Sequence, residues 1–291
     1  MTHRAFAVLS LFAALLIWPA SEAQAEQLEG TLEKIVRTGE FVIGYRTDAS
    51  PLSYENAAGE PSGYSVDFCR RIAAGVKAHL GNNDIDVKFV RVTSEDRLSA
   101  IVRGDIDIEC GSTTITLERQ EQVDFTLPTF VTGGSVLSLT KTGILDMSGL
   151  SGKTVGVVKG TTTVNQLKAY LKENLIDATV IIVSDRKEGM RLLNRRDIHA
   201  FASDQIVLIG QVIEAIDPKV YSLISETFSY EPYAFVVRRN DADFRLVANR
   251  SIAQLYRSGQ HIDIFFKWIG RIGIQPPPIL IAMYQLSTLP E

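Results

Sequence analysis

The chain has 291 residues, of which 45% are hydrophobic and 22% are charged, so it can bury one large core or two medium ones. Its formal net charge is -4, and no block of like charges occurs along it. These features exclude the basic footprint of a nucleic-acid-binding protein and a polybasic membrane patch.

The N-terminal segment has the features of a secretory signal peptide. Arg4 precedes an apolar run from Ala5 to Trp18, and Ala23-Gln24-Ala25 matches the small-x-small cleavage rule. The run is short for a bilayer span, and an uncleaved anchor helix is the alternative. We therefore expect residues 1–25 to be removed and the mature protein, from Glu26, to be soluble outside the cytoplasm.

Strand and helix signals then alternate, which predicts an α/β fold with largely parallel sheets. The first series follows a short helix that Gly39 closes. The spacing of apolar residues predicts a strand at 41–45, a helix at 65–80, a strand at 87–92, a helix at 95–102 and a strand at 106–108. Ser94 precedes the second of these helices and can cap it.

Both cysteines, Cys69 and Cys110, fall in this first series. A disulfide is possible because an exported protein reaches an oxidising compartment. However, Cys69 lies in a helical pattern and Cys110 ends a strand pattern, and the sequence alone does not place them within bonding distance. We therefore expect two buried thiols.

A second series begins near Asp146. It comprises a strand at 154–158, a helix from Gly160 to Leu175, a strand at 180–183, a helix at 188–194 and a strand at 200–203. A strand at 233–238 and helices at 242–257 and 262–268 follow. We expect Pro276-Pro277-Pro278 to end regular structure and to leave residues 276–291 as a tail.

The two series share a short internal echo. Arg103-Gly104-Asp105-Ile106 and Arg195-Arg196-Asp197-Ile198 each follow a predicted helix, 92 residues apart. The same offset pairs Ser112 with Asp204, and Ser94 with Arg186. Ligands of open α/β sheets bind at the carboxyl ends of strands, where Ser112 and Asp204 both fall. Unless the echo is accidental, it predicts two similar lobes that face one cleft.

Catalytic and metal-binding patterns are absent from the sequence. Residues 149–154 resemble a phosphate-binding loop, but the motif requires its first glycine where Met147 stands. Asp107 and Glu109 share one face of a strand, where we expect them to be solvated or paired with arginines. No zinc spacing and no nearby nucleophile accompany the histidines His3, His79, His199 and His261. We expect no metal, no cofactor and no enzymatic activity.

Polar side chains gather instead at the ends of the predicted elements. Arginine pairs with a carboxylate, hydroxyls and helix-start amides bind its other lone pairs, and aspartate balances an ammonium group, so such a set suits a zwitterion. The alternative is that each residue is a helix cap or a surface charge. The candidate substrate-binding residues are Arg46, Ser94, Arg97, Ser112, Thr114, Arg119, Thr162, Arg186 and Asp204.

Through these residues the chain resembles the extracellular amino-acid-binding proteins of ABC importers, solute-binding protein family 3, and most closely their glutamate/aspartate-binding members. The likeness covers nearly all of residues 28–275. Its motifs are Gly63-Tyr64-Ser65-Val66-Asp67, the stretch from Thr93 to Gln120, Gly160-Thr161-Thr162, and Ala200 to Gln205.

The resemblance implies a two-lobed periplasmic-binding-protein type II fold that closes on its ligand by hinge bending. The first lobe would be discontinuous, with residues 26–134 and 234–275, and the second would hold residues 135–233. We expect the two hinge crossings at Gly133-Gly134 and near Tyr230 to Tyr233. The resemblance also implies a periplasmic monomer that delivers an acidic amino acid to the membrane permease of an ABC importer.

It further implies how the α-groups of the ligand are bound. Arg119 would bind the α-carboxylate, with help from Ser112, Thr114 and Thr162. Asp204 would bind the α-ammonium group and would be the one acid in the cleft. The alternatives left open are a receptor for neutral or amide amino acids, a sensing receptor, and a dehydratase-type enzyme on the same fold.

Arg46, together with Arg97 and Ser94, would receive a side-chain carboxylate, which favours glutamate or aspartate. The chain departs from the glutamate/aspartate-binding members at Arg186, where they have a histidine, and at Leu52, where an aromatic residue is common. Arg186 could add a clamp on the distal carboxylate or swing away from it. The preference among glutamate, aspartate and their amides therefore stays open.

Overall fold

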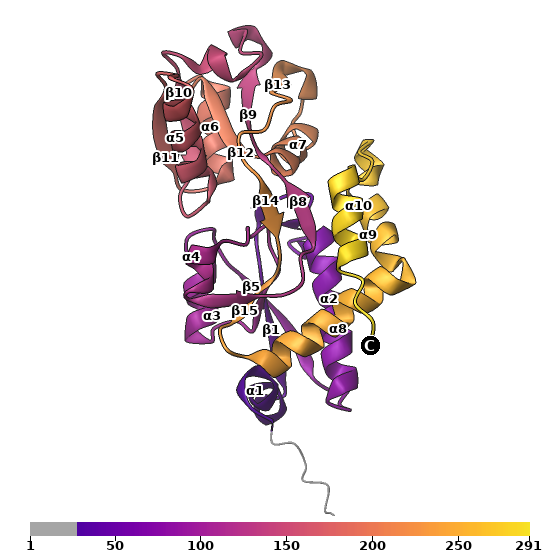
Figure 1. The fold of residues 1–291 in the computed structure, drawn as a ribbon. Coiled ribbons are helices and arrows are strands. Elements are labelled where there is room, and N and C mark those ends of the chain that lie inside the picture. The colour runs from indigo at the N-terminus through magenta and orange to yellow at the C-terminus, as the bar shows by residue number, and fades with distance from the viewer. Residues whose placement is uncertain (1–27) are drawn as a thin grey trace, which may run out of the picture.

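A five-stranded sheet lies in each of the two lobes of the computed structural model, which describes residues 28–291 (Figure 1). Lobe 1 holds the chain before β8 (Phe130–Thr132) and after β14 (Glu231–Tyr233). Its strands lie in the order β5 (Asp86–Arg91), β1 (Glu40–Tyr45), β6 (Ile108–Glu109), β15 (Val236–Arg238) and β7 (Val123–Phe125). β1 is parallel to β5 and β6, whereas β15 is antiparallel to β6 and β7. The predicted signal peptide, residues 1–25, lies outside the described residues.

The apolar run of β1 is buried because helices cover both faces of this sheet. Phe41 and Ile43 belong to the larger core, and Val42 belongs to a smaller core on the opposite face. A continuous apolar run is typical of a strand in a sheet that is covered on both faces. The larger core is built with α1 (Gly30–Thr38), α2 (Tyr64–His79), α8 (Ala242–Ser258) and α9 (Gln260–Trp268), and the smaller core with α3 (Arg97–Arg103).

Lobe 2 repeats the arrangement of lobe 1. Its sheet has the order β11 (Thr179–Val183), β10 (Thr154–Val158), β12 (Ala200–Asp204), β9 (Gly134–Leu139) and β13 (Tyr221–Leu223). β10 is parallel to β11 and β12, and β9 is antiparallel to β12 and β13. The helices are α5 (Thr163–Glu173), α6 (Arg186–Arg195) and α7 (Gln205–Ile213), of which the sequence did not predict α7. The predicted α/β class is confirmed.

The internal echo marks equivalent positions in the two lobes. Its last residue, Ile106 or Ile198, packs against a glycine of the first strand, Gly44 of β1 or Gly156 of β10. A methyl group added at these glycines would lie 2.3 Å and 2.8 Å from the isoleucine Cδ1 atoms. The echo is therefore structural: in both lobes the isoleucine covers the same place on the sheet.

Two strands pass between the lobes side by side. β8 (Phe130–Thr132) leads into β9, β14 (Glu231–Tyr233) leads back towards β15, and the two pair antiparallel (Figure 1). A single strand was expected at 233–238, but the ladder breaks after Tyr233. There the chain leaves the β8–β14 pair and enters the lobe 1 sheet. The Ala234 N–H donates to the Thr113 carbonyl, and the Phe235 N–H donates to Thr126 Oγ1.

The expectation of two free thiols is wrong. Cys69 of α2 and Cys110, which follows β6, form a disulfide with a Cα–Cα separation of 6.3 Å. Both residues are fully buried in the larger core of lobe 1. Helix α2 lies against the sheet and brings Cys69 next to the end of β6, a juxtaposition that no local pattern reveals.

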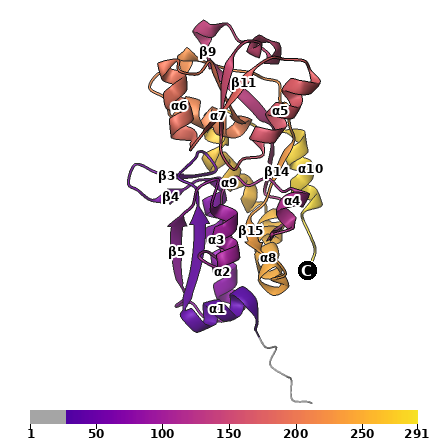
Figure 2. The same cartoon turned by 90° about the vertical axis from the view of Figure 1, so that its left-hand side faces the viewer.

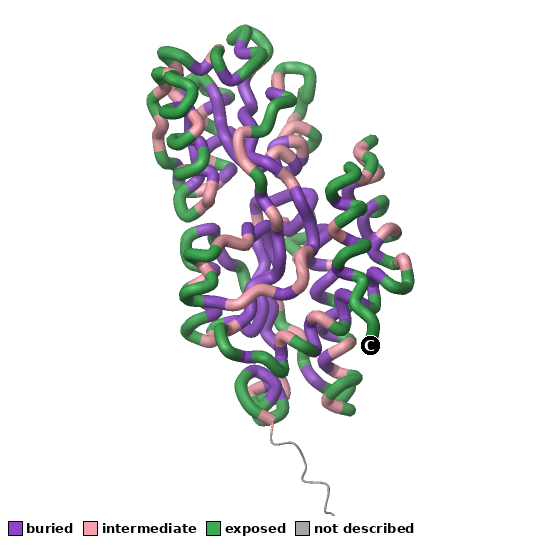
Figure 3. Tube along the Cα trace, viewed as in Figure 1, coloured by how far each residue is buried: buried purple, intermediate pink, exposed green. Residues whose placement is uncertain are grey.

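The expected tail at 276–291 is also wrong, because Pro278–Leu286 forms helix α10. Proline is well accommodated in the first turn of a helix, where its missing N–H would have no intrahelical acceptor. Leu280 and Tyr284 of α10 are buried in the lobe 1 core, and the Tyr284 and Tyr64 hydroxyls share a hydrogen bond of 2.8 Å. Figure 3 shows that buried segments gather along the strands inside each lobe and exposed segments along the outer turns.

The face of lobe 1 that meets lobe 2 carries a small sheet of β2 (Asp48–Ala49), β3 (Ser53–Glu55) and β4 (Pro61–Ser62) (Figure 2). Helix α4 (Leu117–Gln120) lies on the same face. Among residues 28–291, each helix is too short or too polar to cross a membrane.

Candidate functional site

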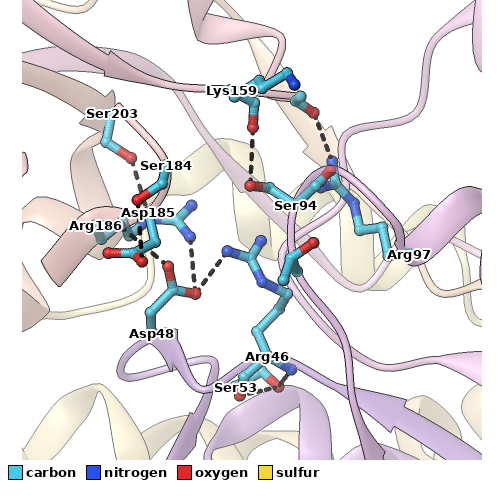
Figure 4. Close-up of polar contacts among 12 residues, drawn as sticks. Arg46, Asp48, Ser53, Ser94, Arg97, Lys159, Ser184, Asp185, Arg186 and Ser203 are labelled. Carbon is cyan, nitrogen blue, oxygen red and sulfur yellow. Dashed lines mark hydrogen bonds and ion pairs between the residues drawn. The ribbon is translucent and has the colours of Figure 1, made fainter. Parts of the chain in front are cut away.

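The two lobes meet where the parallel strands end. Ser94 Oγ of lobe 1 donates to the Lys159 carbonyl of lobe 2 (2.9 Å), and Arg97 Nη2 donates to the Gly160 carbonyl (3.3 Å) (Figure 4). Lys159 Nζ also lies 2.6 Å from Glu95. The residues predicted from the ends of strands and helices therefore come together along one lobe interface.

Asp204 and Ser112 present buried polar atoms at this interface. Asp204 ends β12, and its Oδ2 accepts a hydrogen bond from the Tyr233 hydroxyl. Its Oδ1 and Ser112 Oγ are both buried and have no hydrogen-bond partner within residues 28–291. Burial raises the pKa of Asp204 to about 6, and the charge of Glu231 adds to this rise. Unpaired buried polar atoms cost free energy, so we expect a polar ligand group to supply the missing hydrogen bonds of these two atoms.

Arg119, Thr114 and Thr162 also come together, but Glu231 of the hinge strand β14 joins them. Arg119 Nη1 donates to the Thr114 carbonyl (2.7 Å), and Nη2 donates to the Gly160 carbonyl (3.4 Å). The hydroxyls of Thr114 and Thr162 donate to the same Glu231 oxygen at 2.6 and 2.8 Å. An anionic ligand would therefore meet Arg119 and the first N–H groups of α5, which lack intrahelical acceptors, rather than these two hydroxyls.

Arg46 and Arg186 share the carboxylate of Asp48, which was not among the predicted site residues. Asp48 Oδ1 lies 2.6 Å from Arg46 Nη2 and 3.4 Å from Arg186 Nη1 (Figure 4). Arg186 Nε also donates to Ser203 Oγ at 3.4 Å. Burial alone would raise the pKa of Asp48, but the charges of Arg186 and Arg46 hold it below its ordinary value.

Glu109 was expected to be either solvated or paired with arginines; it is fully buried, which excludes solvation and leaves the arginines as its charged neighbours. Its Oε2 accepts a hydrogen bond from Thr113 Oγ1 (2.8 Å), and the charges of Arg97 and Arg46 oppose the rise in its pKa that burial causes. Burial, with the nearby charge of Arg119, lowers the pKa of Arg97 to about 9, so this guanidinium still carries its charge at neutral pH.

Asp204 was expected to be the one acid in the cleft, and this expectation is wrong. Asp48, Glu109 and Glu231 are also buried there. The second predicted strand carboxylate, Asp107, points elsewhere and pairs with Lys34 at 2.8 Å. Asp48 and Glu231 were missed by the sequence reasoning. Buried arginines need opposite charge nearby, and this need was the one signal in the sequence that could have led to these two acids.

Comparison with known proteins identifies the family. Residues 41–271 match the bacterial extracellular solute-binding proteins, family 3. The chain belongs to this family. An L-glutamate/L-aspartate-binding protein of Pseudomonas aeruginosa is 35% identical over 260 residues, 89% of this chain and 85% of that protein. A glutamate/aspartate import solute-binding protein of Salmonella typhimurium is 33% identical over 283 residues, 95% of this chain and 93% of that protein.

Solved structures agree with the two-lobed fold of this solute-binding protein. A solute receptor for L-cysteine from Neisseria gonorrhoeae superposes with a TM-score of 0.74 at 25% identity, over 85% of this chain and 98% of that chain. The predicted family and the predicted two-lobed periplasmic-binding-protein fold are therefore confirmed. The nine predicted site residues all lie at or beside the lobe interface of this solute-binding protein, and their individual roles remain predictions.

Proposed function

We propose that the chain is the periplasmic amino-acid-binding component of an ABC importer and that it binds L-glutamate or L-aspartate. The observation that carries the proposal is the presence of two opposite charges at the interface. The Asp204 carboxylate, whose Oδ1 has no hydrogen-bond partner within residues 28–291, lies near enough to the Arg119 guanidinium for the two charges to interact. An α-amino acid offers the complementary pair, an ammonium group for Asp204 and a carboxylate for Arg119.

The preference for an acidic side chain rests on the other end of the site. Arg46 and Arg97 are buried there, and the Nε atom of each has no hydrogen-bond partner among the described residues. A second carboxylate would satisfy these donors, whereas an apolar side chain would leave them unpaired. The names of the relatives from Pseudomonas aeruginosa and Salmonella typhimurium support the same ligands.

Binding and hinge closure are coupled in this proposal. The ligand would contact lobe 1 through Arg119 and lobe 2 through Asp204, so it binds the closed arrangement better than an open one. Such differential affinity shifts the population towards closure. The closed lobes would then be recognised by the membrane permease, with the protein acting as a monomer in the periplasm after loss of residues 1–25.

Calorimetric titration of the ligand-stripped mature protein tests the proposal. Glutamate, aspartate, glutamine, asparagine and arginine form the panel, and we expect the two acids to bind tightest. Arg119→Ala should weaken binding of the acids by about 2–5 kcal/mol, because a desolvated carboxylate loses its charged partner. Arg195→Ala, an exposed arginine of lobe 2, is the control and should leave the affinity unchanged. Unchanged binding by Arg119→Ala would contradict the proposed site.

A further inference from the structure

Asp48 lies between arginines that come from opposite lobes. It belongs to β2 of lobe 1, and its Oδ1 lies 2.6 Å from Arg46 Nη2 of the same lobe and 3.4 Å from Arg186 Nη1 of lobe 2. Its Oδ2 accepts a hydrogen bond from the Arg186 backbone N–H (3.3 Å), at the first turn of α6. Figure 4 shows the carboxylate between the two guanidinium groups.

Asp48, Arg46 and Arg186 are buried, so the charge of Asp48 strongly affects the two guanidinium groups. The Arg186 side chain is 1% exposed and the Asp48 side chain 6%. A guanidinium that is removed from water requires a nearby opposite charge. Within residues 28–291, the other hydrogen bond of the Arg186 side chain is to the neutral Ser203 hydroxyl at 3.4 Å. Arg186 therefore already pairs with Asp48, which it shares with Arg46, and it is not a free cation.

We propose that Asp48 is a specificity-determining residue: an internal carboxylate that competes with the distal carboxylate of an acidic ligand for Arg46 and Arg186. A ligand carboxylate that reaches Arg46 enters next to the negative charge of Asp48, whereas an amide of the same shape does not experience this repulsion. Asp48 thus narrows the preference for acids over their amides. The inference rests on the proposed function, since it assumes that the distal end of the ligand lies against Arg46.

A purely mechanical role makes a different prediction. Asp48 also joins the two lobes, so its removal would weaken closure on every ligand alike. A competing charge instead changes the ratio between acid and amide, because only the acid is repelled. The ratio of dissociation constants for glutamine and glutamate therefore separates the two roles.

Asp48→Asn tests the inference, because it removes the charge and keeps an acceptor for the Arg186 N–H. Glutamate, glutamine, aspartate and asparagine are titrated into the ligand-stripped mature protein and into the variant. We expect the glutamine dissociation constant, divided by that for glutamate, to rise by about tenfold or more in the variant. This is the scale of a contact between like charges in a partly shielded interior. Asp48→Ser should raise the same ratio while weakening the binding of both glutamate and glutamine. Asp105→Asn, on an exposed pair with Arg103, is the control.

The outcomes separate this inference from the proposed function. An unchanged ratio, or a shift towards the amide, overturns the role of Asp48 even where the wild type prefers acids. A wild type that prefers an amide overturns the acidic assignment, yet a shift towards the acid in Asp48→Asn still supports the competing carboxylate. Binding of none of the four ligands by either protein overturns both.

Discussion

At the scale of single residues, the site is a set of buried charges that balance one another. Three fully buried arginines and the partly exposed Arg119 face four buried acids in the lobe interface. Each charge removed from water needs a partner, so the acids limit which guanidinium groups a ligand can use. The charged groups are Arg46, Arg97, Arg119, Arg186, Asp48, Glu109, Asp204 and Glu231.

Asp204 is expected to destabilise the ligand-free protein. Burial raises its pKa from an ordinary 3.8 to about 6, so its contribution to stability is greatest below pH 3.8 and is lost as the pH rises through 6. At pH 7.5, Asp204→Asn should therefore raise the free energy of unfolding by about 1–3 kcal/mol. Urea denaturation without ligand measures this gain.

The same variant provides its own control. The stability difference between Asp204→Asn and the wild type should shrink between pH 7.5 and pH 5, because the wild-type carboxyl takes up a proton. The variant should also lose amino-acid binding, since it cannot balance an ammonium charge. Equal stability of the variant and the wild type at pH 7.5 would show that the buried charge of Asp204 does not destabilise the protein.

At the scale of elements, the ends of strands and helices carry the site. Ser112 follows β6 and Asp204 ends the equivalent strand β12, and Cys110 of the disulfide lies two residues before Ser112. This bond joins the end of β6 to α2 and therefore anchors the segment that leads into the site. Its contribution concerns the folding of lobe 1 rather than a contact with the ligand.

Replacement of both cysteines should lower stability substantially. Cys69 and Cys110 are 41 residues apart, and the closure of a loop of this size stabilises a protein by about 4 kcal/mol in the chain-entropy description. Urea denaturation of Cys69→Ala/Cys110→Ala at pH 7.5 measures the loss. Dithiothreitol should destabilise the wild type and leave the double variant unaffected. A variant as stable as the wild type would contradict this account.

At the scale of the whole molecule, the structure is closed, with the lobes touching on both sides of the interface. On one side Ser94 and Arg97 meet residues 159–160, and on another the small sheet of lobe 1 meets α7. Gly210 of α7 makes the second contact possible, since a methyl group there would lie 2.1 Å from the Ser50 carbonyl oxygen.

Gly210→Ala is therefore expected to hinder closure. In the interior of a helix, alanine is favoured over glycine by about 1 kcal/mol, so the protein with its lobes apart should not be destabilised. The affinity for every bound amino acid should fall by about tenfold or more, because the closed arrangement becomes strained. Calorimetry and thermal denaturation measure the two effects. Gly149→Ala, with no other atom nearer than 3.5 Å to its methyl group, is the control in lobe 2.

The sequence by itself determined the α/β class, most helices, the parallel strands of both sheets, the two similar halves and the polar residues at the interface. These features follow from local patterns: apolar periodicity, helix-end residues and a repeated motif. Only the tertiary structure decided the disulfide, helix α10, the break after Tyr233 and the roles of Asp48 and Glu231 as partners of site residues. The reason is physical. A partner depends on which elements pack side by side, and residues such as Asp48 and Arg186 lie far apart in the chain yet meet across two lobes.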